Sequence, residues 1–194
     1  MSKKPWDIVD PASRGDVDER AIFDAVGRAL TEWETLEIEC AKLFAVFVSA
    51  NHKRSYHAPA VRAYGTVTSV DTRFKMLQLA AESYFSKRPA KRDSFEEDCN
   101  DLLGEYKQYA ARRNEIAHGL VQKVFITRKA TKRVSRQSVI GIFLLPSFYN
   151  PKKFKGEKFT YRYVSGDIIH YKQEFTKLYL RIEGLRKKLA PSSW

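Results

Sequence analysis

The chain has 194 residues, of which 43% are hydrophobic and 30% are charged, and its formal net charge is +12. This composition is typical of a globular domain rather than a disordered chain, and no apolar run approaches the roughly 20 residues of a membrane span. The first residues lack the apolar core of a secretory signal, and the two cysteines, Cys40 and Cys99, have no paired spacing. The sequence therefore predicts a cytoplasmic protein with reduced thiols and without a membrane partner, a disulfide framework or a zinc site.

The excess positive charge is confined to the last part of the chain. Residues 1–120 contain 18 Lys and Arg against 19 Asp and Glu, whereas residues 121–194 contain 17 against 4. A cationic region of this kind indicates a polyanionic partner such as RNA, although solubility alone is the alternative explanation.

The first long helix follows a short arm. Residues 1–16 carry turn-forming Pro and Gly and are predicted to be a flexible N-terminal arm, ahead of a single domain over 17–190. Asp16 or Asp18 is expected to cap a helix of about 30 residues, in which apolar side chains recur at spacings of four and three. This apolar stripe comprises Ile22, Val26, Ala29, Trp33, Leu36, Cys40, Leu43 and Phe47.

Two further helices are predicted before residue 120. The first is weak at its start because Gly65 and the β-branched residues after it disfavour a helix. Ser94 and Glu97 have the spacing of a capping box and predict the start of the next helix. That helix is expected to end at Gly119 with a left-handed cap. Its stripe comprises Phe95, Cys99, Leu102, Tyr106, Ala110, Arg113 and Ala117.

The pattern then changes from helix to strand. Strands are predicted over 121–127 and 138–145 with a basic turn between them, and a third over 159–164 after a loop. Ser165 begins a final helix with the stripe Ile168, Tyr171, Phe175, Leu178, Ile182, Leu185 and Leu189. We therefore expect a mainly α fold, a four-helix up-and-down bundle with a small β insertion, at about 120–165, between its third and fourth helices.

Arg113, Asn114 and His118 form the most informative cluster, at the end of the third predicted helix. Asn114 and His118 are four residues apart and share one helical face, whereas Arg113 continues the apolar stripe. Imidazole transfers protons near neutral pH, and a guanidinium holds phosphate oxygens in a fixed fork. An arginine, an amide and a histidine in one groove are sufficient for phosphodiester transesterification without a metal or other cofactor.

The same residues have a purely structural alternative. His118 is then a cap for the helix carbonyls, and Arg113 is one half of an ion pair between helices. A guanidinium on the apolar side needs a counter-charge, which Glu34 or Glu37 of the first helix is expected to supply, unless an anionic ligand does so.

The order Arg113, Asn114, three residues and then His118 at this place in a bundle resembles the motif of the HEPN superfamily. The wider layout is similar to a bacterial HEPN subgroup, and the resemblance covers roughly residues 18 to 189. The matching segments are Trp33 with Glu34 to Glu39, Ala117 to Gly119, Leu144 to Pro146, and Asp167 with Ile168.

The resemblance implies both a reaction and a partner. Arg113 and His118 match the catalytic pair of HEPN proteins, and Asn114 matches the polar residue that follows the arginine. Active members are homodimeric, metal-independent endoribonucleases in which two facing motifs form one cleft, and many act in toxin–antitoxin or phage-defence systems. A protein antitoxin or defence partner is therefore also expected. Other members are non-catalytic modules that bind nucleic acids, nucleotides or proteins, and this is the alternative function.

The basic insertion is predicted to bind RNA, because cations hold phosphates and exposed aromatics stack on unpaired bases. Tyr161 and Tyr163 should share one side of a strand and Arg162 the other. The alternative for these tyrosines is packing against the bundle. The cations assigned to RNA are Arg128, Lys129, Lys132, Arg133, Arg136, Lys152, Lys153 and Lys155.

Overall fold

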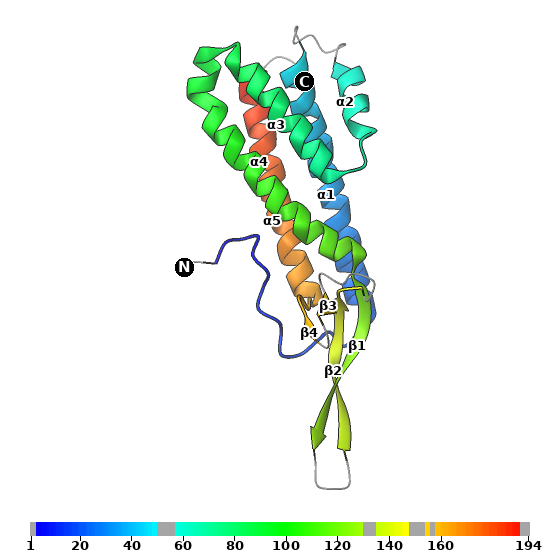
Figure 1. The fold of residues 1–194 in the computed structure, drawn as a ribbon. Coiled ribbons are helices and arrows are strands. Elements are labelled where there is room, and N and C mark those ends of the chain that lie inside the picture. Colours follow the sequence, from blue (N-terminus) through cyan, green and yellow to red (C-terminus); the bar gives the residue numbers. More distant parts are fainter. Residues whose placement is uncertain (1–2, 50–56, 130–134, 148–153, 156–157, 191–194) are drawn as a thin grey trace. The chain divides into compact units, whose positions relative to one another are not determined.

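The computed structural model describes residues 3–49, 57–129, 135–147, 154–155 and 158–190, and its fold is mainly α, as the sequence predicted (Figure 1). The helices are α1 (Glu19–Val48), α2 (His57–Gly65), α3 (Val70–Ser86), α4 (Pro89–His118) and α5 (Ser165–Leu189). The strands are β1 (Leu120–Lys129), β2 (Ser135–Leu145), β3 (Phe154–Lys155) and β4 (Lys158–Phe159). No helix of the described part is both long and apolar enough to cross a bilayer.

The chain forms two compact units. Unit 1 comprises residues 1–31 and 112–173, and unit 2 comprises residues 32–111 and 174–194. The boundaries fall inside α1, α4 and α5, so each of these helices contributes one part to each unit.

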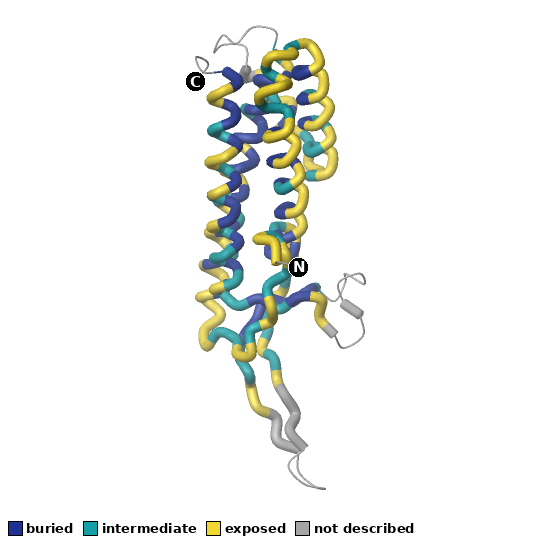
Figure 2. Tube along the Cα trace, turned by 90° about the vertical axis from the view of Figure 1, so that its left-hand side faces the viewer, coloured by how far each residue is buried: buried dark blue, intermediate teal, exposed yellow. Residues whose placement is uncertain are grey.

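The apolar stripes predicted for α1 and α5 form much of the buried core. All seven stripe residues of α5 are buried, as are those of α1 except Val26, which is intermediate. In unit 2, Trp33 stacks on Tyr106 with ring centroids 5.3 Å apart and meets the edge of Phe175 at 5.1 Å. Figure 2 shows buried and exposed positions alternating along the helical turns, as expected for helices with one apolar face.

Unit 2 also buries charged side chains. Glu39 is 1% exposed and pairs with Arg186, which is 3% exposed. The other carboxylate oxygen of Glu39 accepts a hydrogen bond from Lys42 Nζ at 3.2 Å. This pair joins α1 to α5. Because it is buried, removing either partner would leave the charge of the other buried without compensation.

The start of α1 agrees with the prediction, whereas the start of α4 differs from it. Asp18 caps α1, because its carboxylate accepts the amide of Arg20 at 2.9 Å. α4, however, begins at Pro89, and Ser94 lies inside it with its hydroxyl donating to the carbonyl of Ala90 at 3.0 Å. The predicted capping box is therefore wrong. Proline is favoured in the first turn of a helix because it has no amide to leave unpaired.

The second predicted helical stretch consists of two helices, α2 and α3. Ser69 caps α3 by accepting the amide of Thr72 at 3.3 Å. Arg73 Nε donates to the carbonyl of Val67 at 2.6 Å, so a side chain of α3 satisfies a carbonyl in the break between the helices. The weakness noted at Gly65 thus marks the end of α2.

Strands β1 and β2 form an antiparallel hairpin in unit 1, paired from Leu120 and Leu145 to Lys129 and Ser135 (Figure 1). Both strands are longer than predicted. The predicted strand over 159–164 is wrong, because its end pairs with β2 only through the bridge between Tyr163 and Leu144. The short strands β3 and β4 pair with each other. β3 lies within the region predicted to be a loop, and β4 begins just after it.

The predicted flexible arm has specific contacts within unit 1. Gly15 donates its amide to the carbonyl of Ile140 at 2.9 Å, and Asp16 exchanges two backbone hydrogen bonds of 2.9 Å with Ile142. A Cβ atom on Gly15 would lie 2.6 Å from the backbone N and O of Ile142. Gly141 has a φ of +134° at the same place, next to a bulge in the ladder. Glycines therefore allow the arm to join the edge of β2.

Asp16 caps α5 rather than α1. Its carboxylate accepts the amide and the hydroxyl of Ser165 at 2.7 and 2.8 Å. Asp167, in the first turn, accepts the amide of Val164 at 3.0 Å. Two carboxylates at a helix N-terminus also suit the positive end of the helix dipole.

Candidate functional site

The predicted site residues lie in the last two turns of α4, within unit 1. Asn114 and His118 are exposed, and Arg113 is half-buried with its Nη1 donating to Asn114 Oδ1 at 3.3 Å. On a regular helix, Asn114 and His118 differ by about 40° around the axis, whereas Arg113 and His118 differ by about 140°. The amide and the imidazole therefore share a face, and the guanidinium is linked to that face through the amide.

His118 is the last residue of α4. Within the described part of the chain, no hydrogen bond or ion pair engages its imidazole. The alternative that His118 is a cap for the helix carbonyls has no support from these residues. Both ring nitrogens are therefore open to a ligand or to solvent.

Gly119 follows the helix as predicted, but not with left-handed geometry. Among the described glycines, Gly141 is the one with a positive φ. A Cβ on Gly119 would lie 2.6 Å from Leu144 Cγ and 3.0 Å from the carbonyl oxygen of Glu115. Gly119 is thus required for the close approach of the end of α4 to β2.

A buried polar cluster lies next to the predicted site residues, at the last turns of α4. Its members, here called the Glu115 cluster, are Arg112, Glu115, Tyr161 and Tyr163. Glu115 Oε2 accepts the Tyr163 hydroxyl at 2.6 Å and lies 3.0 Å from Arg112 Nη1, and the Glu115 carbonyl accepts the Tyr161 hydroxyl at 3.1 Å. Burial, followed by the nearby Glu115 charge, raises the pKa of both tyrosines well above the ordinary value, so both remain proton donors at neutral pH.

Periodicity predicts Arg113 on the buried side, and Arg113 is half-buried with its Nε enclosed, but Arg112 is buried more deeply. Arg112 is 9% exposed, whereas Arg113 is intermediate. The apolar stripe alone points to Arg113, whereas the spacing of Arg112 and Glu115, three apart, is that of a helical ion pair. That spacing was the available signal for the Glu115 cluster.

The tyrosines of the basic insertion are not exposed stacking platforms. Tyr161 and Tyr163 are 3% and 0% exposed and stack on each other at 4.9 Å, so the packing alternative is confirmed for both. Arg162 lies on the opposite side, as predicted, where it donates to the carbonyl of Ala12 at 2.7 Å and covers the ring of Phe143 at 4.7 Å.

Glu37 is not the counter-charge of Arg113. Its carboxylate pairs with Arg73 at 3.0 Å and accepts the Tyr106 hydroxyl at 2.7 Å, all within unit 2. Glu34 is exposed on α1 in unit 2, and its pairing with Arg113 stays a prediction.

The structure places the predicted RNA-binding cations only in part. Arg128 and Lys129 end β1, Arg136 lies in β2 and Lys155 lies in β3, and Arg128 is directly opposite Arg136 in the ladder. No Asp or Glu occurs from Leu120 through Gly156. The remaining predicted cations lie outside the described residues: Lys132, Arg133, Lys152 and Lys153.

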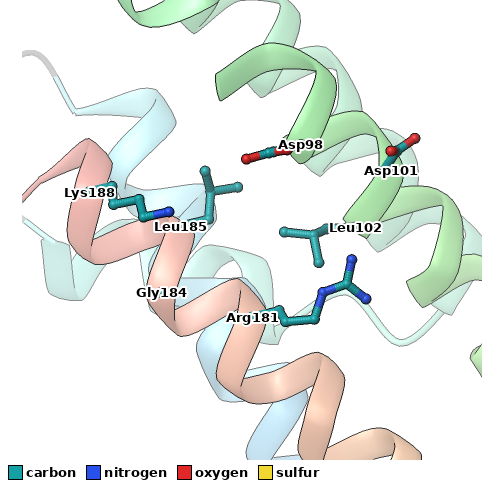
Figure 3. Close-up of a pocket in the computed structure, with 7 residues that line it drawn as sticks. All are labelled: Asp98, Asp101, Leu102, Arg181, Gly184, Leu185 and Lys188. Atoms are coloured by element: carbon teal, nitrogen blue, oxygen red, sulfur yellow. The ribbon is translucent and has the colours of Figure 1, made fainter. Parts of the chain in front are cut away.

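Other places that could hold a ligand do not coincide with the predicted site. The described residues bring together no group of three or more His, Cys, Asp or Glu that could hold a metal ion. A pocket of about 310 Å³ lies between α4 and α5 in unit 2 (Figure 3). Asp98 and Asp101 line one wall and Arg181 and Lys188 the other, and Arg181 pairs with Glu105 at 2.6 Å. Charges of both signs on opposite walls are typical of a solvated groove between helices.

Models of known protein families, curated proteins and solved structures give no match to this chain. The functional assignment therefore depends on the site itself.

Proposed function

We propose that this chain is a metal-independent endoribonuclease of HEPN type, built on a four-helix bundle, with Arg113 and His118 as catalytic residues. The observation that carries the proposal is the exposed imidazole of His118 at the end of α4, on the same face as Asn114 and two residues before the basic hairpin. The hydrogen bond from Arg113 to Asn114 supports a role for all three residues on one ligand.

The reaction is an exchange of phosphate ester bonds. The ribose 2′-hydroxyl attacks the adjacent phosphorus, His118 accepts its proton, and the bond from phosphorus to the 5′-oxygen breaks. Arg113 stabilises the charge that develops on the phosphorane oxygens. The products are a 2′,3′-cyclic phosphate and a 5′-hydroxyl, and no water or metal is consumed.

The proposed active form is a homodimer. The leaving 5′-oxygen needs a proton donor while the 2′-hydroxyl needs an acceptor, and His118 of a second copy supplies the second group. The angle of about 140° between Arg113 and His118 on one helix also favours a site completed by another copy. Light scattering should give a dimer at micromolar concentration, and a monomer that cleaves RNA contradicts the composite site.

The hairpin is proposed to hold the RNA beside the site. The segment from Leu120 through Gly156 contains Lys and Arg but no Asp or Glu, a charge balance that favours binding of RNA phosphates. β1 places Arg128 about 26 Å along the strand from Leu120, at roughly 3.3 Å per residue. An RNA that contacts both His118 and the hairpin end must therefore be considerably longer than a dinucleotide.

RNA cleavage in EDTA tests the proposal. His118→Ala and Arg113→Ala should each lower the cleavage rate by about 10² or more, and RNA with a 2′-deoxy nucleotide at the cut position should resist cleavage. The controls are Arg92→Ala, an exposed arginine elsewhere on α4, and His170→Ala. Equal cleavage by wild type and both site variants, or no cleavage of any RNA tried, refutes the assignment.

A non-catalytic RNA-binding module is the second candidate, because the absence of acidic residues from Leu120 through Gly156 supports RNA binding with or without cleavage. It predicts RNA binding that weakens steeply with salt and produces no cleavage. For the enzyme, by contrast, we propose a toxin or phage-defence role with an acidic antitoxin as partner. Expression in cells should then be toxic, His118→Ala should remove the toxicity, and the antitoxin should co-purify with the chain.

A further inference from the structure

We infer that Tyr163 and Glu115 are positioning residues that fix the last turn of α4 and thereby orient Arg113 and His118. This inference rests on the proposed function. It assigns a role to two buried residues that the sequence motif does not include.

Glu115 is held at both its side chain and its backbone. It is 4% exposed. Its Oε2 accepts a hydrogen bond from the Tyr163 hydroxyl at 2.6 Å and forms an ion pair with Arg112 Nη1 at 3.0 Å. Its carbonyl is among the last four of α4, which have no amide partner within the helix. Tyr161 donates to that carbonyl at 3.1 Å. The segment that carries the two tyrosines thus caps the helix from outside.

Tyr163 is itself fixed. It is 0% exposed, and its backbone exchanges hydrogen bonds of 2.8 and 3.0 Å with Leu144 of β2. Its ring meets the edge of Tyr171 at 5.5 Å. Leu144 also occupies the space where a Cβ of Gly119 would lie. The turn that carries His118 therefore has Tyr163 and Leu144 as rigid supports.

Such support matters more for catalysis than for binding. A displacement of about 1 Å at a reacting group can cost on the order of 10² in rate. Tyr163→Phe removes one oxygen atom, keeps the ring that packs on Tyr161 and Tyr171, and removes the 2.6 Å hydrogen bond to Glu115. RNA held by the hairpin should bind as before, so kcat should fall at least tenfold with KM unchanged.

The chain offers a closely matched control on the same helix. Tyr106 is 0% exposed and donates to Glu37 Oε1 at 2.7 Å, and Glu37 pairs with Arg73 at 3.0 Å. This set of tyrosine, glutamate and arginine has the same chemistry as the Glu115 cluster but lies in unit 2. Tyr106→Phe therefore reproduces the loss of a buried hydroxyl without touching the site.

The experiment compares Tyr163→Phe with Tyr106→Phe by cleavage kinetics and by the NMR signal of the His118 ring, assigned by its absence in His118→Gln. Tyr163→Phe should lower kcat at least tenfold and move the His118 signal, and Tyr106→Phe should do neither. Equal kcat losses, or an unchanged His118 signal in Tyr163→Phe, overturn the inference. If Tyr163→Phe does not fold, Tyr161→Phe is judged by the same criteria.

The proposed function and the positioning role of Tyr163 can be refuted independently. If wild type cleaves no RNA, the proposed function is wrong, and the NMR comparison still decides whether Tyr163 orients His118. If cleavage depends on His118 but is insensitive to Tyr163→Phe, the function stands and the positioning role is wrong.

Discussion

Gly15→Ala should detach the N-terminal arm from the edge of β2. The added Cβ would lie 2.6 Å from both the backbone N and the backbone O of Ile142. Backbone atoms in a paired strand cannot rotate away as a flexible side chain does, so the arm itself must move. The ring of Phe143, also 2.6 Å away, closes the remaining direction.

The expected loss follows from the hydrogen bonds that this movement breaks. Three backbone bonds of 2.9 Å hold Gly15 and Asp16 to β2, and each contributes about 1 kcal/mol net. The alanine restricts the unfolded chain and returns about 0.4 to 1 kcal/mol. The free energy of unfolding should therefore fall by about 2 to 3 kcal/mol, which lowers the Tm by roughly 4 to 12 °C in a chain of this length.

Urea unfolding and amide hydrogen exchange measure the two parts of this prediction. The amides of Gly15, Asp16 and Ile142 should lose protection in Gly15→Ala. Gly27→Ala is the control, because nothing lies within 4 Å of a Cβ at that position in α1, and it should gain about 0.5 to 1 kcal/mol. Wild-type stability and protection in Gly15→Ala would refute the reasoning.

Three other outcomes are expected. Arg186→Met should destabilise unit 2 by about 3 kcal/mol, because it leaves Glu39 buried without its main partner. Adding Glu39→Leu should recover most of that loss, as measured by urea unfolding. Additive losses in the double variant would contradict this. Burial raises the pKa of Cys99 to about 12, so its alkylation at pH 7.5, followed by mass spectrometry, should be at least 10³-fold slower than that of a free thiol and become rapid in urea; rapid labelling of the native protein contradicts this. Replacing Arg128 and Arg136 together with alanine should weaken RNA binding and reduce the slope of log K against log salt by about 1.4 to 1.8, whereas Arg92→Ala should not; an unchanged slope contradicts a role for this pair.

The sequence predicted best those elements in which apolar periodicity alone decides the structure. The stripes of α1 and α5 are buried as expected because a run of 25 or 30 helical residues averages out local exceptions. The predicted start of α4 was wrong because the capping-box pattern at Ser94 and Glu97 competes with another local signal, the proline at position 89. Short signals of this kind cannot be ranked without the surrounding chain.

The residue types at the candidate site were predicted from the sequence, but the buried residues that hold them in place were not. Periodicity could not decide between Arg112 and Arg113, because a charged residue is buried only where a partner meets it. The spacing of three residues indicates Glu115 as the partner of Arg112. Tyr163, which completes the cluster, is 48 positions from Glu115 in the sequence. The incorrect prediction of a strand over 159–164 has the same cause. The alternating pattern of side chains there reflects the burial of two tyrosines and not a continuous ladder of strand hydrogen bonds.

The contacts of the N-terminal arm also constrain the order in which the chain folds during synthesis. The hydrogen bond from Tyr171 to the carbonyl of Asp7 spans 164 positions, and that from Ser165 to Asp16 spans 149. At roughly 5 to 20 residues per second, the ribosome takes on the order of 10 to 30 s to deliver these partners. Unit 1 is therefore completed only after the start of α5 has emerged, whereas α1 can form long before. The speed of translation between the arm and the start of α5 thus controls how long the arm stays unpaired.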